Sequence, residues 1–506
     1  MYVRKNKGRN GTYTVQVVEK RKGKVRLISS FGTSADFESL SKMELKAKQF
    51  IEDRIGQMDL FPDKEDDQMR KLVSGLSSSQ IQVVGPELIL GKVFDFVGFN
   101  QVADPLFRHL ILGRLVFPGS KLKTVDYLHR FQGAEYSVSS VYRYLDSLQD
   151  EVKEQIEKIA LAHVRKVLGE PFAAVFYDIT TLYFETSKED ELRRIGYSKD
   201  GKVNHPQILV GLLVGVQGFP IAFDVFEGNK FEGLTLISFL ENNAHKLGGK
   251  KPVVVADAGL LNKENLEGLR SRGYEFIIGA RLKNEPESLK TEIINKYKNE
   301  KSIKEFKRSD GSRLLVTFSE KRKAKDLGNR TKGFNRLAEK VKSGKLTKEH
   351  INQRGYNRYL IMDGNSTIKI NQQAFDADAK WDGLKGYVTN CKLKRSEIVA
   401  NYKQLWHIEK AFRISKTDLV VRPIYHRKAN RIRAHILIAF CAYLIWKEVE
   451  RQLGNQQSQI SASRAIELCQ NIYQITFTLP KSQEKISQMI QLSDEQQSLV
   501  DIFYPT

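Results

Sequence analysis

Two short apolar runs in the middle of the chain have the pattern of buried strands, and each closes on an aspartate. Residues 173–178 end at Asp178, and residues 252–257 end at Asp257. Short apolar runs rich in valine and aromatic residues favour strands over helices. The turn-forming pair Ala258-Gly259 follows the second run directly. The pattern therefore predicts two strands that each end on a carboxylate.

The segments around these aspartates alternate between strand and helix periods. Residues 207–216 and 219–226 are β-rich and meet at Gln217-Gly218, which predicts a hairpin. Further along, the pattern predicts a helix over 232–247, a second helix over 263–272 and a strand over 274–282. This order of elements is that of a ribonuclease H-like fold. The sequence therefore predicts an α/β core.

A third acid lies late in the chain, on a segment with helical spacing. Residues 401–416 contain neither Gly nor Pro, which predicts one continuous helix. Tyr402, Glu409 and Lys416 are seven residues apart, so about 3.6 residues per turn places them on one face. A carboxylate on a half-buried face is costly unless it has a role. The alternative is a surface glutamate with lysine neighbours at helical spacing.

In this order the motifs resemble the DDE transposases of bacterial insertion sequences, in the broad superfamily of insertion sequence four. The signature of that group is a Tyr, then an Arg after two intervening residues, a Glu after three more, and a Lys after six more. Residues 401–416 match this signature at Tyr402, Glu409 and Lys416. Leu405 occupies the Arg position, which puts the phosphate contact of that Arg in question. The other matching stretches are 177–181, 256–259 and 406–413, and the resemblance covers about residues 1–450.

The resemblance implies a transposase that binds the ends of its insertion sequence, cleaves DNA and joins 3′ ends to target DNA. Asp178, Asp257 and Glu409 would be the catalytic residues and the ligands of two Mg²⁺ ions, for which Mn²⁺ can substitute. Hard cations held by carboxylates can place positive charge over both the attacking and the leaving oxygen of a phosphodiester. The partner would be double-stranded DNA, both inverted-repeat ends and target, bound by a homodimer.

DNA contacts near the third acid follow from the same segment. Tyr402 and Lys416 would orient DNA phosphates, as the resemblance implies. Arg413 lies four residues after Glu409, and its planar guanidinium can bind a phosphate through two bonds. We therefore expect Arg413 to replace the charge missing at Leu405. The alternative is that Leu405 packs in the core and Lys416 alone contacts the phosphate.

Two other functions stay open. One is a ribonuclease H-like nuclease without strand transfer, against which the long insertion and the additional basic regions argue. The other is a catalytically inactive, transposase-derived DNA-binding protein, against which the three intact acids argue.

Charge supports a nucleic-acid partner. Lysine and arginine outnumber aspartate and glutamate by 82 to 60, which gives a formal charge of +22 and a pI near 9.6. This balance favours a polyanionic ligand, although a soluble protein with a basic surface is an alternative.

The patterns divide the 506 residues into six segments. In order, they are an N-terminal β-hairpin and helical segment over 1–75, a helical DNA-binding domain over 76–169, the first part of the core over 170–282, a β-rich basic insertion over 283–390, the second part of the core over 391–450, and a C-terminal helical tail over 451–506.

One helix of the second segment has the pattern of a helix-turn-helix recognition helix. Ser137 can cap it, and residues 138–148 present one apolar face. Ser139, Ser140 and Arg143 lie on the opposite face and are suited to phosphates or base edges. An ordinary amphipathic bundle helix is the alternative.

The remaining signals concern compartment and histidines. Three cysteines without paired spacing, and no apolar leader, favour a reducing, cytoplasmic location. The resemblance to bacterial transposases implies a nucleoid-associated protein. The longest apolar run, 436–446, is far shorter than the about 20 residues that span a bilayer, so we expect a buried helix. His426 and His435 are flanked by Arg and Lys, which favours phosphate contacts or structural histidines over metal ligands.

Overall fold

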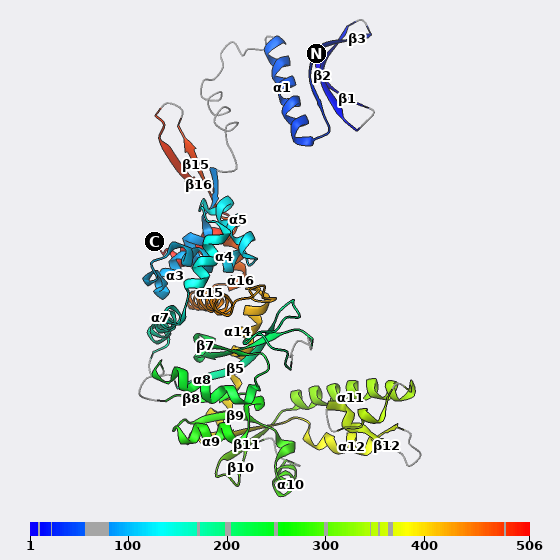
Figure 1. Ribbon diagram of the computed structural model, residues 1–506, viewed down its shortest axis with the longest axis vertical. Coiled ribbons are helices and arrows are strands. Elements are labelled where there is room, and N and C mark those ends of the chain that lie inside the picture. The colour runs from blue at the N-terminus through cyan, green and yellow to red at the C-terminus, as the bar shows by residue number, and fades with distance from the viewer. Residues whose placement is uncertain are drawn as a thin grey trace. The chain divides into compact units, whose positions relative to one another are not determined.

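The computed structural model describes residues 1–8, 11–21, 23–55, 80–169, 173–197, 204–246, 251–297, 302–344, 346–352, 355–362, 368–479 and 482–505. The chain divides into two compact units, Met1–Gln80 and Ile81–Thr506. Figure 1 shows both units and labels many of their elements.

The first unit is a small antiparallel sheet with one helix. Its strands β1 (Tyr2–Lys7), β2 (Tyr13–Arg21) and β3 (Lys24–Ser34) pair in that order, and α1 (Phe37–Ile55) packs on them. Its core is Val15, Val17, Leu40 and Ala47. The predicted N-terminal hairpin is present as β2 and β3, and β1 adds a third strand to it. The polar stretch 62–67, which the sequence suggests as a linker, lies outside the described residues.

The first part of the second unit is helical, as expected. Its helices are α3 (Lys92–Val97), α4 (Pro105–Val116), α5 (Lys121–Gln132), α6 (Val138–Ser147) and α7 (Asp150–Leu168). Side chains that accept backbone N–H bonds start three of these helices: Asp104 for α4, Ser120 for α5 and Ser137 for α6. The apolar helix α15 (Ala429–Asn455) packs against α3, α4 and α6 and is buried along most of its length, as the sequence predicts. No helix of the described part is long and apolar enough to cross a membrane.

One sheet of eight strands forms the centre of the second unit, in the order β10-β11-β14-β9-β8-β5-β6-β7. Its strands are β5 (Ala174–Tyr183), β6 (Gln207–Val214), β7 (Pro220–Glu227), β8 (Val253–Ala256), β9 (Phe276–Ala280), β10 (Lys304–Lys307), β11 (Arg313–Phe318) and β14 (Leu384–Thr389). β8 runs parallel to β5 and β9, and the other neighbours are antiparallel. The predicted hairpin between β6 and β7 is confirmed. The helices α8 (Thr235–Asn243) and α9 (Lys263–Ser271) lie between strands in the predicted order.

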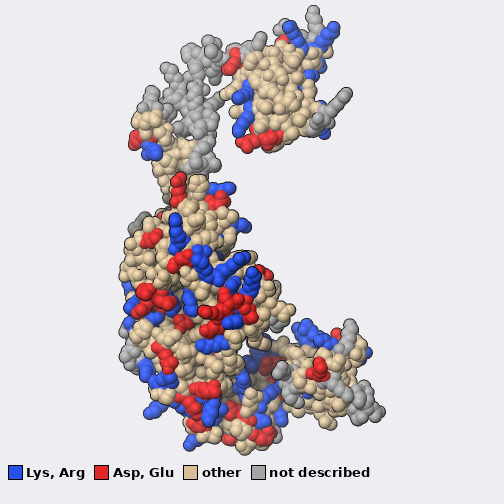
Figure 2. All heavy atoms as spheres, in the orientation of Figure 1, with Lys and Arg blue, Asp and Glu red and all other residues tan. Residues whose placement is uncertain are grey.

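The segment 283–390 is more helical than the β-rich expectation. It contains α10 (Glu287–Lys296), the long α11 (Glu320–Lys342) and α12 (Gln372–Asp378). Its strands β10, β11 and β14 extend the central sheet, and only β12 (Leu360–Met362) and β13 (Ile368–Ile370) form a separate pair among the described residues. The basic stretch beginning at Lys321 forms α11, along which lysine and arginine gather in Figure 2.

The C-terminal segment is not purely helical, contrary to the expectation from the sequence. Between α16 (Ala462–Cys469) and α17 (Asp494–Phe503) lies a hairpin of β15 (Tyr473–Thr478) and β16 (Lys485–Met489). β15 also pairs with β4 (Ile81–Val83), near the other end of this unit's sequence. Pairing with a strand this distant leaves no local sequence signal, which explains the error.

Candidate active site

The strand register places the two aspartates side by side. β8 runs parallel to β5, with Tyr177 opposite Ala256. The next residues are Asp178 and Asp257, so both lie at the same level on neighbouring strands, which are about 4.8 Å apart in a sheet. Both residues are half-buried. A catalytic or metal-binding pair of carboxylates can form here.

The expectation that a strand ends at Asp178 is wrong. β5 continues to Tyr183, because residues 179–183 pair with the first half of β6. Asp257, by contrast, lies directly after β8, as expected. Its Oδ1 accepts the backbone N–H of Gly259 at 2.8 Å, which fixes the orientation of the carboxylate.

The segment 401–416 is two helices rather than one. α13 (Arg395–Lys403) ends just before Gln404, and α14 (Trp406–Thr417) begins just after Leu405. The N–H groups of Gln404 and Leu405 bond to carbonyls three residues earlier, which tightens the chain between the helices. α13 packs on β8 and β9, whereas α14 packs on β5 and β6. The continuous stripe of Tyr402, Glu409 and Lys416 is therefore wrong.

Tyr402 nevertheless lies among all three acids. Its side chain is 6% exposed, and its ring packs edge-on against Tyr387 at 4.8 Å between centroids. Burial raises the pKa of the Tyr402 hydroxyl, and the negative charges of Asp257, Glu409 and Asp178 raise it further. One hydroxyl is therefore within electrostatic reach of acids from two strands and α14.

Glu409 lies in the first turn of α14 and is exposed. The partial positive charge of a helix N-terminus favours a carboxylate there. Lys385 on β14 is a second neighbour: burial lowers the pKa of its ammonium group, Arg322 lowers it further and Glu409 raises it. The Lys385 Nζ lies 4.4 Å above the Tyr402 ring. The third acid is thus next to a cation that the sequence did not single out.

The three carboxylates have the right donor atoms for a hard divalent cation, but they do not by themselves form a complete binding site for one. Carboxylate oxygens are the ligands that Mg²⁺ takes in proteins, usually one or two together with substrate phosphates. Within the described residues, no group of three His, Cys, Asp or Glu side chains is close enough to hold a metal ion. The donor set therefore fits a site in which DNA phosphates supply further ligands.

A basic groove of about 510 Å³ starts beside this site. Its wall runs from Ala258 and Tyr402 to residues of the segment 283–390, including the half-buried Trp381. The cations that line it are Arg281, Lys283, Arg322, Arg358 and Lys385.

Most of the groove cations have acidic partners. Lys283 and Arg358 both pair with Asp378, at 2.7 and 2.6 Å. Arg322 pairs with Asp326 at 3.4 Å. Within the described residues, Arg281 and Lys385 have no ion pair. These two cations are therefore available to bind an anion.

The comparisons with known proteins identify a family. Residues 172–445 match the family model of the transposase DDE domain. The chain belongs to this family. The match contains both aspartates, Glu409 and every strand of the central sheet.

Solved transposase structures are also similar to this DDE domain protein, at low identity. The piggyBac transposase synaptic complex with hairpin DNA is 9% identical, with 76% of this chain and 78% of that chain covered and a TM-score of 0.38. The Mos1 mariner paired-end complex with Mn is 10% identical, with 46% and 72% covered and a TM-score of 0.15. The Drosophila P element transposase strand transfer complex is 11% identical, with 80% and 90% covered and a TM-score of 0.21. The search of curated proteins found no match.

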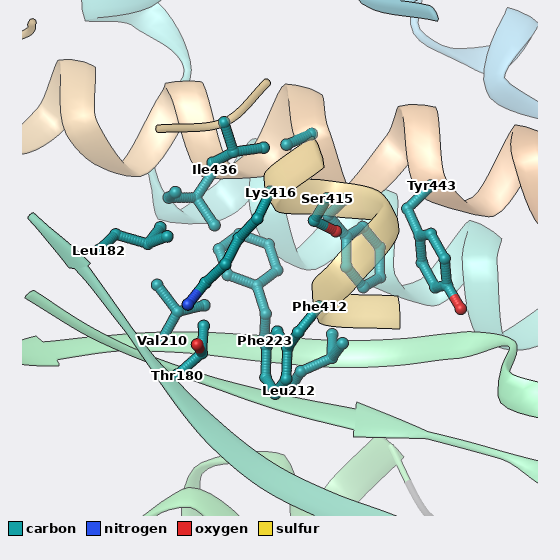
Figure 3. A pocket seen from close by; sticks show the side chains of 13 residues that line it. Thr180, Leu182, Val210, Leu212, Phe223, Phe412, Ser415, Lys416, Ile436 and Tyr443 are labelled. Atoms are coloured by element: carbon teal, nitrogen blue, oxygen red, sulfur yellow. The ribbon is translucent and has the colours of Figure 1, made fainter. Parts of the chain in front are cut away.

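Lys416 of the DDE domain lies on the far end of α14 from Glu409. Figure 3 shows its side chain over the sheet, with the ammonium group beside Thr180. Thr180 is two residues after Asp178 on β5, so both side chains lie on the same face. The surrounding cavity is otherwise mainly apolar, with Phe223, Phe412 and Tyr443 in its lining. A role for Lys416 at a DNA phosphate remains a prediction.

The other predicted DNA contacts of the DDE protein lie on two helices. Arg413 is exposed on α14, while Leu405 is 6% exposed and packs in the core. On α6, Arg143 and Ser139 are exposed, and the Ser140 hydroxyl donates to the carbonyl of Ser137 at 2.7 Å. The apolar face of α6 is buried at Val141 and Leu145, as predicted. Contact of these residues with DNA stays a prediction.

Sequence reasoning missed Lys385, Arg281 and Gly279 of the DDE domain. A Cβ at Gly279 would lie 2.5 Å from the Tyr402 hydroxyl oxygen, so glycine is required for the close approach. A glycine inside an apolar strand indicates such an approach and could have drawn attention to it. Lys385 and Arg281 had no comparable signal, because only the pairing of β14 with β9 brings them to the site.

Proposed function

We propose that this protein is a transposase of the insertion sequence four superfamily. It would bind the inverted-repeat ends of its element as a homodimer, cleave DNA, and join the 3′ ends to target DNA by metal-dependent phosphoryl transfer. The observation that carries the proposal is the register of β5 and β8, which sets Asp178 beside Asp257 under the helix that bears Glu409. The family match supports the reaction class.

Asp178, Asp257 and Glu409 would hold the divalent cations. Bound Mg²⁺ supplies positive charge over the attacking and leaving oxygens of the phosphodiester. The Mn of the Mos1 complex supports Mn²⁺ as a substitute. The bond between Asp257 and the Gly259 N–H holds that carboxylate in place before any ligand arrives.

Tyr402 and Lys385 would position the DNA backbone. Because burial and the acids raise its pKa, the Tyr402 hydroxyl stays protonated and can donate a hydrogen bond to a phosphate oxygen. Lys385 lies directly over the Tyr402 ring and next to Glu409, so its ammonium group can bind the same or the next phosphate. The basic groove continues this path away from the acids.

The test of the function is a reaction of the purified protein with duplex DNA that carries an element end. With Mg²⁺ we expect nicks at the end, followed by joined products in which the free 3′ end is attached to a second duplex. Nicks without joined products would favour a nuclease without strand transfer. Specific binding without any nick would favour an inactive DNA-binding protein and contradict the proposal.

The groove predicts a change in the salt dependence of DNA binding. Removing one cation that binds a phosphate is expected to reduce the slope of log K against log salt by about 0.9. Lys385→Gln and Arg281→Gln should each show this reduction in fluorescence-anisotropy titrations. Lys296→Gln is the control, because Lys296 is on α10 and already pairs with Glu292 at 2.7 Å. Equal slopes of log K against log salt for all three variants would show that the groove cations do not contact DNA.

The helix α6 predicts a loss of affinity for the element end. If Arg143 contacts a base, Arg143→Ala should weaken binding by about 1–3 kcal/mol and relax the sequence preference at that position. A phosphate contact would weaken all sequences alike. Arg130→Ala on α5 is the control, because Arg130 already pairs with Asp126 at 2.8 Å. Unchanged affinity of the Arg143 variant in a gel-shift series would make α6 an ordinary bundle helix.

A further inference from the structure

A second cationic cluster lies among the helices of the second unit. Arg114 near the end of α4 is 5% exposed, Lys121 at the start of α5 is 4% exposed, and His435 on α15 is 6% exposed. His426, in the segment before α15, is half-buried, and its ring centroid is 5.4 Å from that of His435. Burial lowers the pKa of each histidine, and the charges of Lys121 and Arg114 lower it further. The four side chains therefore interact electrostatically.

The hydrogen bonds of this cluster satisfy only some of its members. His435 Nε2 donates to the carbonyl of Val421 at 3.0 Å, which leaves Nδ1 as an acceptor for Arg114 Nη2 at 3.5 Å. His435 is therefore a neutral, satisfied histidine, one of the two alternatives from the sequence. Arg114 Nη1 reaches the carbonyl of Leu419 at 3.4 Å. Both hydrogen bonds of Arg114 are long, so its guanidinium can still donate shorter, stronger hydrogen bonds to another acceptor.

No acid of the described residues neutralises the cluster. The charge of Asp146 raises the pKa of His426, but Asp146 is bound to Arg431 by two hydrogen bonds of 2.7 Å each. Neither Arg114 nor Lys121 forms an ion pair within the described residues, and the Lys121 ammonium has no hydrogen-bond partner there either. Lys121 is 4% exposed as a residue, and burial together with the charge of Arg114 lowers the pKa of its ammonium group. A charged lysine is therefore unfavourable here unless an anion binds beside it. Lys121 also lies in the first turn of α5, where the partial positive charge of the helix N-terminus adds to the charge of the cluster.

We propose that Arg114, Lys121 and His426 form a binding site for a phosphate group. A guanidinium, an ammonium and an imidazole N–H offer donors to several oxygens of one tetrahedral anion. The N-terminus of α5 favours the same charge. His426 is half-buried, and the two residues that follow it, Arg427 and Lys428, are exposed to solvent. The phosphate comes either from the DNA backbone or from free inorganic phosphate.

The surroundings connect this site to α6. The ring of Tyr142 on α6 packs edge-on against His426, with 6.0 Å between centroids. The guanidinium of Arg431 lies 4.7 Å above the same Tyr142 ring. A phosphate bound at His426 is therefore next to the helix proposed to contact DNA, although the site itself does not depend on catalysis.

Thermal unfolding of the full chain tests the site, with inorganic phosphate as the probe. In phosphate, compared with chloride at equal ionic strength, the wild type is expected to gain about 2 °C in Tm. Lys121→Met should lose this gain and should be no less stable than wild type without phosphate, because it removes a lysine whose charged form is disfavoured by burial and by Arg114. Lys123→Met, an exposed lysine on the same helix, should keep the gain. His426→Gln is the second variant and should also lose it.

DNA binding distinguishes the two sources of phosphate. If the DNA backbone supplies the anion, Lys121→Met should lower the salt slope of duplex binding by about 0.9 relative to wild type. If the slope is unchanged while the thermal gain is lost, free phosphate is the ligand. If Lys121→Met and His426→Gln match wild type in both measurements, the site does not exist.

Discussion

Asp178→Asn, Asp257→Asn and Glu409→Gln are each expected to lower Mg²⁺-dependent cleavage at an element end by about a thousandfold or more. Each change would remove a charged oxygen ligand from the proposed metal site while keeping the shape of the side chain. Specific DNA binding should survive, because losing a carboxylate reduces repulsion of the phosphates. Single-turnover cleavage and gel-shift affinity, measured on the same preparation, check both parts.

Asp418→Asn is the matched control for these variants. Asp418 also carries a carboxylate, but it caps the far end of α14 from Glu409. Its replacement should leave cleavage near the wild-type rate. A folded variant of any of the three acids that retains near-normal cleavage in Mg²⁺ would contradict the proposed site.

The two aspartates could be found from sequence because each belongs to a short apolar run. Strand propensity and the turn after Asp257 are local signals, and the structure has both strands. Their alignment was beyond such reasoning, because the parallel pairing of β5 with β8 depends on contacts across 79 residues, from 178 to 257. The same limit hid Lys385, which reaches the acids only through the pairing of β14 with β9.

The break between α13 and α14 shows a second limit. Nothing in residues 401–416 disfavours a continuous helix, since Gly and Pro are absent. The two halves pack on different pairs of strands, and tertiary contacts override a weak helical preference. Tyr402 and Glu409 belong to different helices, yet they are close enough for the charge of Glu409 to raise the pKa of the Tyr402 hydroxyl.

Gly279 gives the second large expected effect. A Cβ at this position would lie 2.5 Å from the Tyr402 hydroxyl oxygen and 2.9 Å from the backbone nitrogen of Ala258. Gly279→Ala must therefore displace Tyr402 or the backbone that carries Asp257. A displacement of about 1 Å at a catalytic group can cost about a hundredfold in rate. We expect that loss in single-turnover cleavage, with thermal unfolding showing that the variant is folded.

Gly328→Ala is the control for added volume. Gly328 lies in α11 and has no heavy atom within 4 Å of an added Cβ, so the change should stabilise the helix by about 1 kcal/mol and leave cleavage unchanged. Cleavage by Gly279→Ala at the wild-type rate would contradict the prediction, because it would show that the site tolerates the added methyl group.

The double variant Gly279→Ala/Tyr402→Phe identifies which group moves. Tyr402→Phe removes the oxygen nearest to the added Cβ, so the double variant should cleave at the rate of Tyr402→Phe alone if the hydroxyl is what the methyl group displaces. If the Ala258 backbone moves instead, the two losses add, because the contact at 2.9 Å remains. A coupling energy near zero in this cycle would therefore assign the effect to Asp257, whose carboxylate is one residue from Ala258, and a large coupling would assign it to Tyr402.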